Sequence, residues 1–142
     1  MASGDSGFGL PQMSEQEMFD KLLSEDSARD DSEPAIAAGI GEQMLHMSLR
    51  PLPRSMRARI RDISARVPAR NAVLIGGGIG HLSAWLLDLW CGDPANPPEQ
   101  PPSRPESFRI VEPGGKFGII IDRLIRRHGA EKWTQIIQMP WG

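Results

Sequence analysis

Val73-Leu74-Ile75-Gly76-Gly77-Gly78-Ile79-Gly80-His81 is the stretch of this 142-residue chain that decides its fold. A short apolar run, residues 72–75, leads into a cluster of glycines, and its length is typical of a buried strand. Glycine adopts positive φ without strain and carries no Cβ, so the turn can be tight and its backbone can come close to a ligand. A helix that begins after such a turn offers backbone N–H groups to a carboxylate or a phosphate. The stretch therefore predicts a strand, a turn and a helix that together form a binding site.

An acidic residue, Glu112, stands at the end of a second predicted strand, residues 108–111. Ligands of such sheets bind at the carboxyl ends of parallel strands, where this carboxylate would meet the glycine turn and accept both hydroxyls of a ribose. The two features are usually about 20 residues apart, and a proline-rich loop, residues 93–107, accounts for the longer separation here. The pair predicts an adenosine-containing cofactor. The structural alternative is a glycine turn that merely packs the helix on the strand.

Strands and helices alternate through the second half of the chain. Apolar residues at helical spacing follow the glycine turn and again follow Glu112, and a last apolar run predicts a third strand. Parallel strands joined through helices require right-handed crossovers. We therefore expect an α/β fold, a Rossmann-like parallel sheet of three strands in the order βαβαβ, preceded by N-terminal helices. The residues that carry this prediction are Leu82, Trp85, Leu86, Leu89 and Trp90; Phe117, Ile120, Ile121, Leu124 and Ile125; and 133–138.

Three regions are expected along the chain. Residues 1–33 are acidic and poor in apolar side chains, which predicts a largely flexible tail with one short helix that begins at a capping box, Ser14 and Glu17. Residues 34–70 are expected to form a helical cap, whose arginines we interpret as a solvated helix face. Residues 71–142 are expected to form a cofactor-binding Rossmann-like half-domain. The arginines of the second cap helix are Arg54, Arg57, Arg59, Arg61 and Arg66.

Composition and charge exclude some classes of protein for this chain. The formal net charge is −2 and the pI is about 5.9, so neither a nucleic acid nor an anionic membrane is expected as a partner. The single cysteine, Cys91, excludes an internal disulfide framework and a multi-cysteine metal site, and no metal is expected. No apolar run approaches the roughly 20 residues that span a bilayer, and the N-terminus lacks the apolar core of a secretory signal. A cytoplasmic protein is expected.

The glycine turn and the acidic residue together resemble class I S-adenosylmethionine-dependent methyltransferases, in particular small-molecule O-methyltransferases of the catechol type. In that family the first strand ends in G-x-G-x-G, which Gly76, Gly78 and Gly80 match, and the second ends in an acidic residue. The third glycine of the dinucleotide pattern G-x-G-x-x-G would fall on His81 instead. The resemblance covers 71–141 and extends through Arg109-Ile-Val-Glu-Pro, Leu124-Ile-Arg-Arg-His-Gly-Ala and Trp133-Thr-Gln-Ile-Ile.

The resemblance implies a set of cofactor contacts. The three glycines of G-x-G-x-G would bracket the methionine part of S-adenosylmethionine, and Glu112 would bind its ribose. The start of the following helix would lie near the methionine carboxylate, and the residues after Glu112 would lie beside the adenosine. The implied cofactor-binding residues are Gly76, Gly78, Gly80, His81, Ser83, Glu112, Pro113 and Gly114. For His81 the alternative is a surface residue at the start of a helix. No catalytic residue can be named.

Two departures from the family pattern leave further functions open. Leu74 stands where the family has an acidic residue, and the later strands that hold the methyl-acceptor pocket have no counterpart here. We therefore expect the cofactor-binding half of an enzyme with a small-molecule methyl acceptor, whose first strand lies at an exposed sheet edge and leads to self-association or binding of a partner chain. The alternatives are a catalytically inactive methyltransferase-like binding subunit, and an FAD- or NAD-binding oxidoreductase fragment, because Gly76 to Ala84 also looks like a flavin-binding turn.

Overall fold

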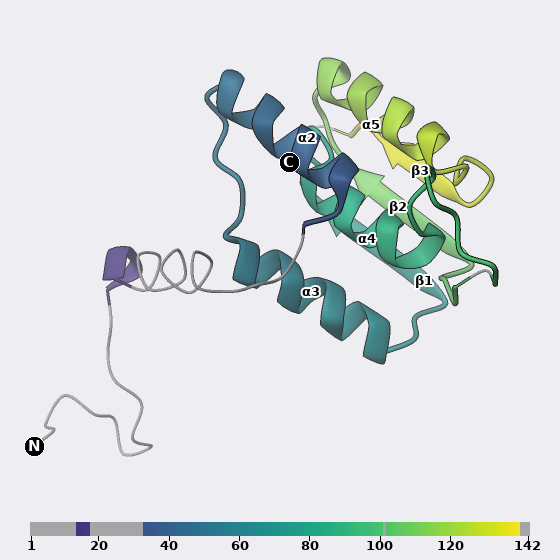
Figure 1. Cartoon of the computed structure of the whole chain (residues 1–142). Coiled ribbons are helices and arrows are strands. Elements are labelled where there is room, and N and C mark those ends of the chain that lie inside the picture. The colour runs from purple at the N-terminus through teal and green to yellow at the C-terminus, as the bar shows by residue number, and fades with distance from the viewer. Residues whose placement is uncertain (1–13, 18–32, 101, 140–142) are drawn as a thin grey trace, which may run out of the picture.

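The predicted alternation of strands and helices is confirmed. The computed structural model describes residues 14–17, 33–100 and 102–139 (Figure 1). From residue 33 onward, two helices precede a three-stranded sheet, and one further helix lies between each pair of consecutive strands. The elements are α2 (Ala35–His46), α3 (Arg54–Arg66), β1 (Asn71–Ile75), α4 (His81–Cys91), β2 (Ser107–Val111), α5 (Gly115–Arg127) and β3 (Thr134–Ile137).

The three strands form one parallel sheet in the order β1-β2-β3. Ala72 of β1 pairs with Phe108 of β2, which in turn pairs with Thr134 of β3. The strands 72–75 and 108–111 therefore lie side by side, as the shared binding edge requires. Because β1 is the first strand of this order, it lies at the edge of the described sheet, as expected.

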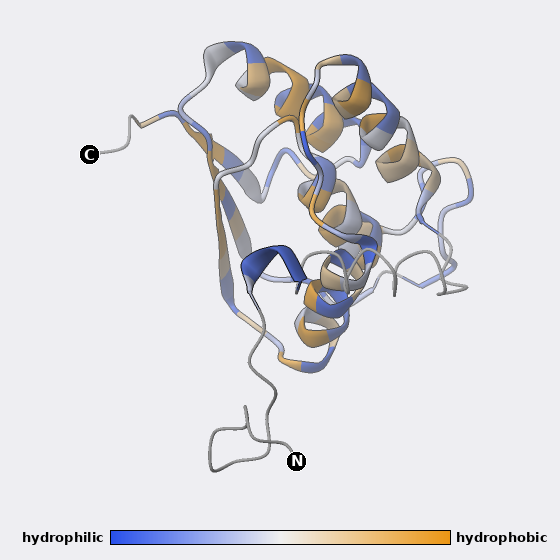
Figure 2. Ribbon diagram, turned by 90° about the vertical axis from the view of Figure 1, so that its left-hand side faces the viewer, coloured by the Kyte–Doolittle hydropathy of each residue, from blue (hydrophilic) through white to orange (hydrophobic). Residues whose placement is uncertain are grey.

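All four of the labelled helices lie on one face of the sheet (Figure 2). Strand order 1-2-3 with right-handed crossovers places α4 and α5 on the same side. Helix α4 contacts the other three helices. Of these, α2 and α3 pack on its outer side. Along β1 partly buried positions alternate with exposed ones, and Val73 and Ile75 on the face away from the helices are 56% and 70% exposed. The opposite face of the sheet is therefore bare in the described part of the chain.

The hydrophobic core lies between the sheet and the helix layer. Phe108 and Ile110 of β2 are 1% and 0% exposed, and α4 lies directly over them. Trp90 packs edge-on against Phe108, with ring centroids 5.0 Å apart. Each fully buried aliphatic or aromatic side chain of this kind contributes about 1.5–3 kcal/mol relative to exposure. The core therefore fixes α4 on the sheet, and with it the turn that precedes α4.

The proline-rich loop is held against the domain at its C-terminal end. Pro105 is buried, and the guanidinium of Arg104 lies 4.5 Å from the ring centroid of Trp133. Asp93 begins the loop with an Asx turn, in which its Oδ1 accepts the N–H of Ala95 at 2.9 Å. The insertion thus leaves both the glycine turn and Glu112 in place, since it returns the chain to the start of β2.

Little of the predicted tail falls within the described residues. The N–H of Glu17 donates to Ser14 Oγ at 3.1 Å, as in the first half of the predicted capping box, and residues 15–17 are helical. The rest of that short helix lies outside the described residues. Among the helices that are described, none is both long and apolar enough to cross a bilayer.

Candidate functional site

The glycine turn has the backbone geometry that its sequence predicts. Gly76, Gly78 and Gly80 have φ values of 86°, 58° and 98°, in the left-handed region where a side chain is strained. The N–H groups of Gly76 and Gly77 both donate to Val111 O, at 2.9 and 3.2 Å, which ties the turn to the end of β2. These glycines therefore allow the chain to turn sharply out of β1 into α4.

The turn is open on one side and tightly packed on the other. A Cβ placed on Gly76 or Gly78 would meet no other atom within 4 Å, so space remains beside the backbone there. A Cβ on Gly77 would lie 2.6 Å from Cγ2 of Ile110 and 3.0 Å from Cδ1 of Ile121. A ligand can therefore approach the backbone at Gly76 and Gly78, whereas Gly77 serves the packing of the turn on the core.

Glu112 lies at the mouth of this turn. Its Oε1 accepts the N–H of Gly78 at 2.8 Å, and its Oε2 accepts the N–H of Gly114 at 2.8 Å. The side chain is largely buried, with 7% of the residue exposed. Each carboxylate oxygen has two lone pairs, so one acceptor position remains on each after these bonds. Glu112 thus couples the two loops that follow β1 and β2 and keeps the capacity to accept two hydroxyls.

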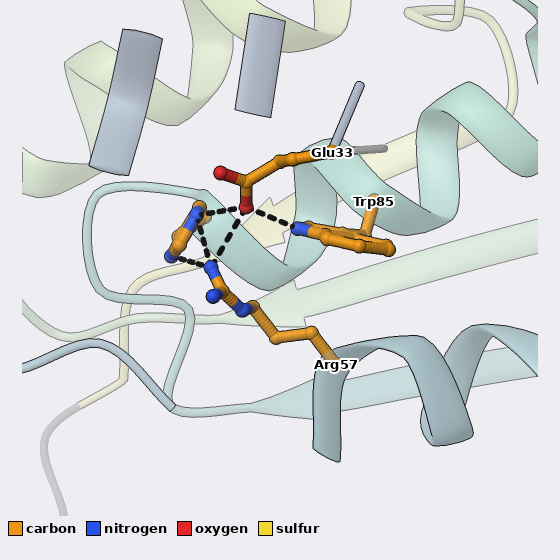
Figure 3. A network of polar contacts seen from close by, with 4 residues as sticks. Glu33, Arg57 and Trp85 are labelled. Carbon is orange, nitrogen blue, oxygen red and sulfur yellow. Dashed lines mark hydrogen bonds and ion pairs between the residues drawn. The ribbon is translucent and has the colours of Figure 1, made fainter. Parts of the chain in front are cut away.

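The start of α4 carries a polar cluster that the sequence did not predict. His81, the first residue of α4, is 6% exposed, so the alternative that it lies on the surface is wrong. Its Nε2 lies 2.9 Å from Oε2 of Glu33 and 2.8 Å from Nη1 of Arg57. Trp85 Nε1 donates to the same Glu33 oxygen at 2.8 Å (Figure 3). We call these four residues the α4 polar cluster.

The charge of Glu33 is stabilised inside this cluster. Burial by itself raises the pKa of Glu33, but the hydrogen bonds from His81 and Trp85 and the positive charge of Arg57 outweigh it and hold the pKa below its ordinary value of 4.5. Arg57 is 8% exposed, so it does not belong to the solvated helix face that the arginine run predicted. Neither Glu33 nor Arg57 has a local sequence signal, because they lie 24 residues apart and pair through the fold.

The other predicted site residues have simpler positions. Ser83 is completely buried within α4, and its Oγ has no hydrogen-bond partner in the described part of the structure. Pro113 lies between Glu112 and Gly114 and is partly exposed beside the turn. A cavity of about 410 Å³ opens between α3, α4 and β1, but neither the glycine turn nor Glu112 lines it. The structure thus brings together the turn, Glu112 and Pro113. A cofactor contact by Ser83 stays a prediction, and the structure shows no exposed surface on this residue.

Comparisons with known proteins place this fold. No protein-family model matches the sequence, and a search of curated proteins finds no similar one. Among solved structures, the chain is similar to an O-methyltransferase from Bacillus cereus in complex with SAH, at a TM-score of 0.60 and 15% identity, over 84% of this chain. It is also similar to TomG, an O-methyltransferase of Streptomyces achromogenes involved in tomaymycin synthesis and solved with SAM, at 0.56 and 17%, over 89% of this chain.

The same matches cover 50% and 53% of those two enzymes, so this chain spans about half of their length. At such low identity the likeness concerns the fold. The predicted Rossmann-like α/β fold is confirmed, and it is the fold of about half of an O-methyltransferase.

Proposed function

We propose that this chain binds S-adenosylmethionine and forms the cofactor-binding half of an O-methyltransferase-type enzyme with a small-molecule acceptor. The observation that carries the proposal is the Glu112 carboxylate, 2.8 Å from Gly78 N beside the glycine turn. A carboxylate at that place, with acceptor positions to spare, suits a ribose whose two hydroxyls need partners. The solved O-methyltransferases with the same fold carry SAH or SAM, which supports this cofactor over others.

The chemistry of the described residues suits such a cofactor. A Cβ on Gly76 or Gly78 would meet no atom of another part of the chain within 4 Å, which leaves room for a thioether or sulfonium to approach the backbone. The N-terminus of α4, with its positive end of the helix dipole, suits an anionic group such as the methionine carboxylate. When bound, S-adenosylmethionine would supply an electrophilic methyl group. The role of this chain would be to hold the sugar, the methionine end and hence the sulfur at fixed positions, which is a large part of catalysis by orientation.

Binding of one ligand class tests the proposal. We expect calorimetric titration to show binding of S-adenosylmethionine and S-adenosylhomocysteine and no binding of FAD or NAD. His81 stands where a dinucleotide-binding turn needs a third glycine, so the approach of a pyrophosphate is hindered at this position. Binding of FAD or NAD instead would support the oxidoreductase alternative. If none of the four ligands bound, the alternative of a catalytically inactive binding subunit would be favoured. Leu74, in place of the family's acidic residue, also favours that alternative.

The bare face of the sheet and the free edge of β1 support the proposal of a half-domain. Paired positions across the strands put Val73 beside Arg109, and Ile75 beside Val111, on the face away from the helices. An exposed apolar edge strand of this kind pairs readily with another chain. Because this chain covers only 50% and 53% of the two solved neighbours, we propose that the complementary half of a methyltransferase domain covers this face.

Self-association in the absence of that half is the expected consequence. We expect sedimentation velocity to show oligomers at micromolar concentration, and Ile75→Lys to reduce them, because the variant puts a charge on the bare face beside the edge. Ile119→Lys is the matched control, since Ile119 on α5 is also exposed, at 58%, but lies in the helix layer. A stable, folded monomer of the unsubstituted chain would contradict the prediction.

A further inference from the structure

A single oxygen atom of Glu33 is the centre of the α4 polar cluster. Oε2 lies 2.7 Å from Arg57 Nη1, 2.9 Å from His81 Nε2 and 2.8 Å from Trp85 Nε1 (Figure 3). These groups come from three places in the chain, namely the segment just before α2, helix α3 and the first two turns of α4. Arg57 and Trp85 donate to this oxygen, and His81 Nε2 is a third hydrogen-bonding partner whose role depends on its tautomer, so the arrangement is a preorganised site for a carboxylate.

The donors of this site require an anion. Arg57 and His81 are each more than nine-tenths buried, with 8% and 6% exposed, and the guanidinium lies 5.6 Å from the ring centroid of Trp85. A buried guanidinium cannot release its proton, and leaving it without an anionic partner is strongly destabilising. Glu33 supplies that anion from the chain itself. Any other carboxylate that reached the same donors would have to replace it.

The site adjoins the place where the cofactor is proposed to bind. His81 directly follows Gly80, so the carboxylate of Glu33 is held at the N-terminus of α4, next to the glycine turn. Helix α2 passes over the cluster, and a Cβ on Gly41 would lie 3.3 Å from His81 Nε2. Glu33 is two residues ahead of Ala35, the first residue of α2, so a movement of this helix end would withdraw the carboxylate.

We propose that Arg57, His81 and Trp85 form the binding site for the methionine carboxylate of S-adenosylmethionine, and that Glu33 is an internal competitor which occupies it until the cofactor displaces it. The inference rests on the proposed function, because it assigns a ligand group to the same site and adds its regulation. One oxygen position cannot serve two carboxylates, so cofactor binding and the Glu33 contacts are mutually exclusive. The apparent affinity for the cofactor is then lowered by the population in which Glu33 is bound.

The variant Glu33→Gln tests the competition in the full chain. The amide of glutamine is neutral, so it binds Arg57 less tightly than the carboxylate does. We therefore expect calorimetry to show that S-adenosylhomocysteine binds about tenfold more tightly to the variant. This factor corresponds to the free energy of about one hydrogen bond to a charged group. Asp88→Asn is the matched control. It removes a carboxylate 2.7 Å from Arg61, another contact between α3 and α4, but one farther along α4 from the glycine turn. Its affinity should equal that of the unsubstituted chain.

A second ligand separates competition from a structural role of the cluster. Methylthioadenosine has the same adenosine and thioether but no carboxylate, so its affinity should be equal in the Glu33→Gln variant and the unsubstituted chain. Equal affinities for S-adenosylhomocysteine as well, or a weaker one in the variant, would overturn the competition and leave the proposed function intact. Failure of both ligands to bind any variant would contradict the proposed function itself and the competition with it.

A conservative variant covers the case in which Glu33→Gln does not fold. Glu33→Asp keeps the negative charge but withdraws the carboxylate by one methylene, and circular dichroism would verify its fold. We expect a gain in affinity for S-adenosylhomocysteine of a few fold, again without a gain for methylthioadenosine, because a weakened competitor is easier to displace. No gain in this folded variant would overturn the inference.

Discussion

Glu112→Ala should bind S-adenosylhomocysteine at least about 100-fold more weakly than the unsubstituted chain, because hydrogen bonds to a charged group are worth about 1.5–3 kcal/mol each and two ribose hydroxyls lose their acceptor. The substitution also removes the acceptors of Gly78 N and Gly114 N, at 2.8 Å each, so the two loops lose the contact that joins them. Calorimetry measures the first effect, and urea unfolding monitored by circular dichroism measures the second.

Two further variants make this result specific. Glu112→Gln keeps the size of the side chain but has one acceptor oxygen, and its NH₂ group would face one of the two backbone donors, so an intermediate loss is expected. Glu106→Ala removes an exposed carboxylate whose partner is Arg70, and it should bind like the unsubstituted chain. If Glu112→Ala retained folding and full affinity, the carboxylate would have no part in cofactor binding, and the proposed function would lose its main support.

The sequence was sufficient to predict the fold because its signals are local. The apolar run before Gly76 and the helical spacing after it each depend on neighbouring residues, so strand, turn and helix follow from the periodicity. The position of Glu112 at the turn follows from one additional rule, that the carboxyl ends of parallel strands share an edge. This position could be predicted without knowledge of side-chain packing, whereas the bond from Gly78 N to the carboxylate is seen only in the structure.

The α4 polar cluster could not be predicted in the same way. Glu33 and Trp85 are 52 residues apart, and no periodic pattern connects them. The arginine run of α3 suggested a solvated face, because arginine is mostly exposed in proteins, whereas Arg57 is buried and Arg61 donates to Asp88 at 2.7 Å. Which arginines of a helix face inward depends on the carboxylates that the fold brings to them. That information is tertiary.

The same distinction applies within the glycine turn. The pattern of alternating glycines singled out Gly76, Gly78 and Gly80, whose positive φ is a local property. Gly77 lies between them without positive φ, and its importance comes from Ile110 and Ile121, which belong to other elements. Glycine is therefore required in this run for two different reasons. Some positions need a positive φ, and Gly77 has no room for a Cβ.

Gly77→Ala should lower the free energy of unfolding by about 1–3 kcal/mol, the usual cost of forcing an extra methyl group into a packed core. The new Cβ would lie 2.6 Å from Cγ2 of Ile110, a branch close to the backbone of β2 on a side chain that is 0% exposed. The Cδ1 atom of Ile121, 3.0 Å away, can turn aside, but Cγ2 moves only with its strand. The strain should therefore fall on β2 and on the turn it supports. Urea unfolding measures the loss.

Gly39→Ala is the opposite case and serves as the control. Gly39 lies within α2, and a Cβ there would meet no other atom within 4 Å, so alanine should raise the free energy of unfolding by about 0.5–1 kcal/mol through its higher helix propensity. The same chemical change is thus expected to alter the free energy of unfolding in opposite directions at the two positions. At Gly39 the methyl group is added to an exposed part of a helix, whereas at Gly77 it is added to a packed core. A Gly77→Ala variant as stable as the unsubstituted chain would show that β2 and α5 can yield at the turn. The close packing that sets the position of the glycine backbone relative to Glu112 would then have to come from elsewhere.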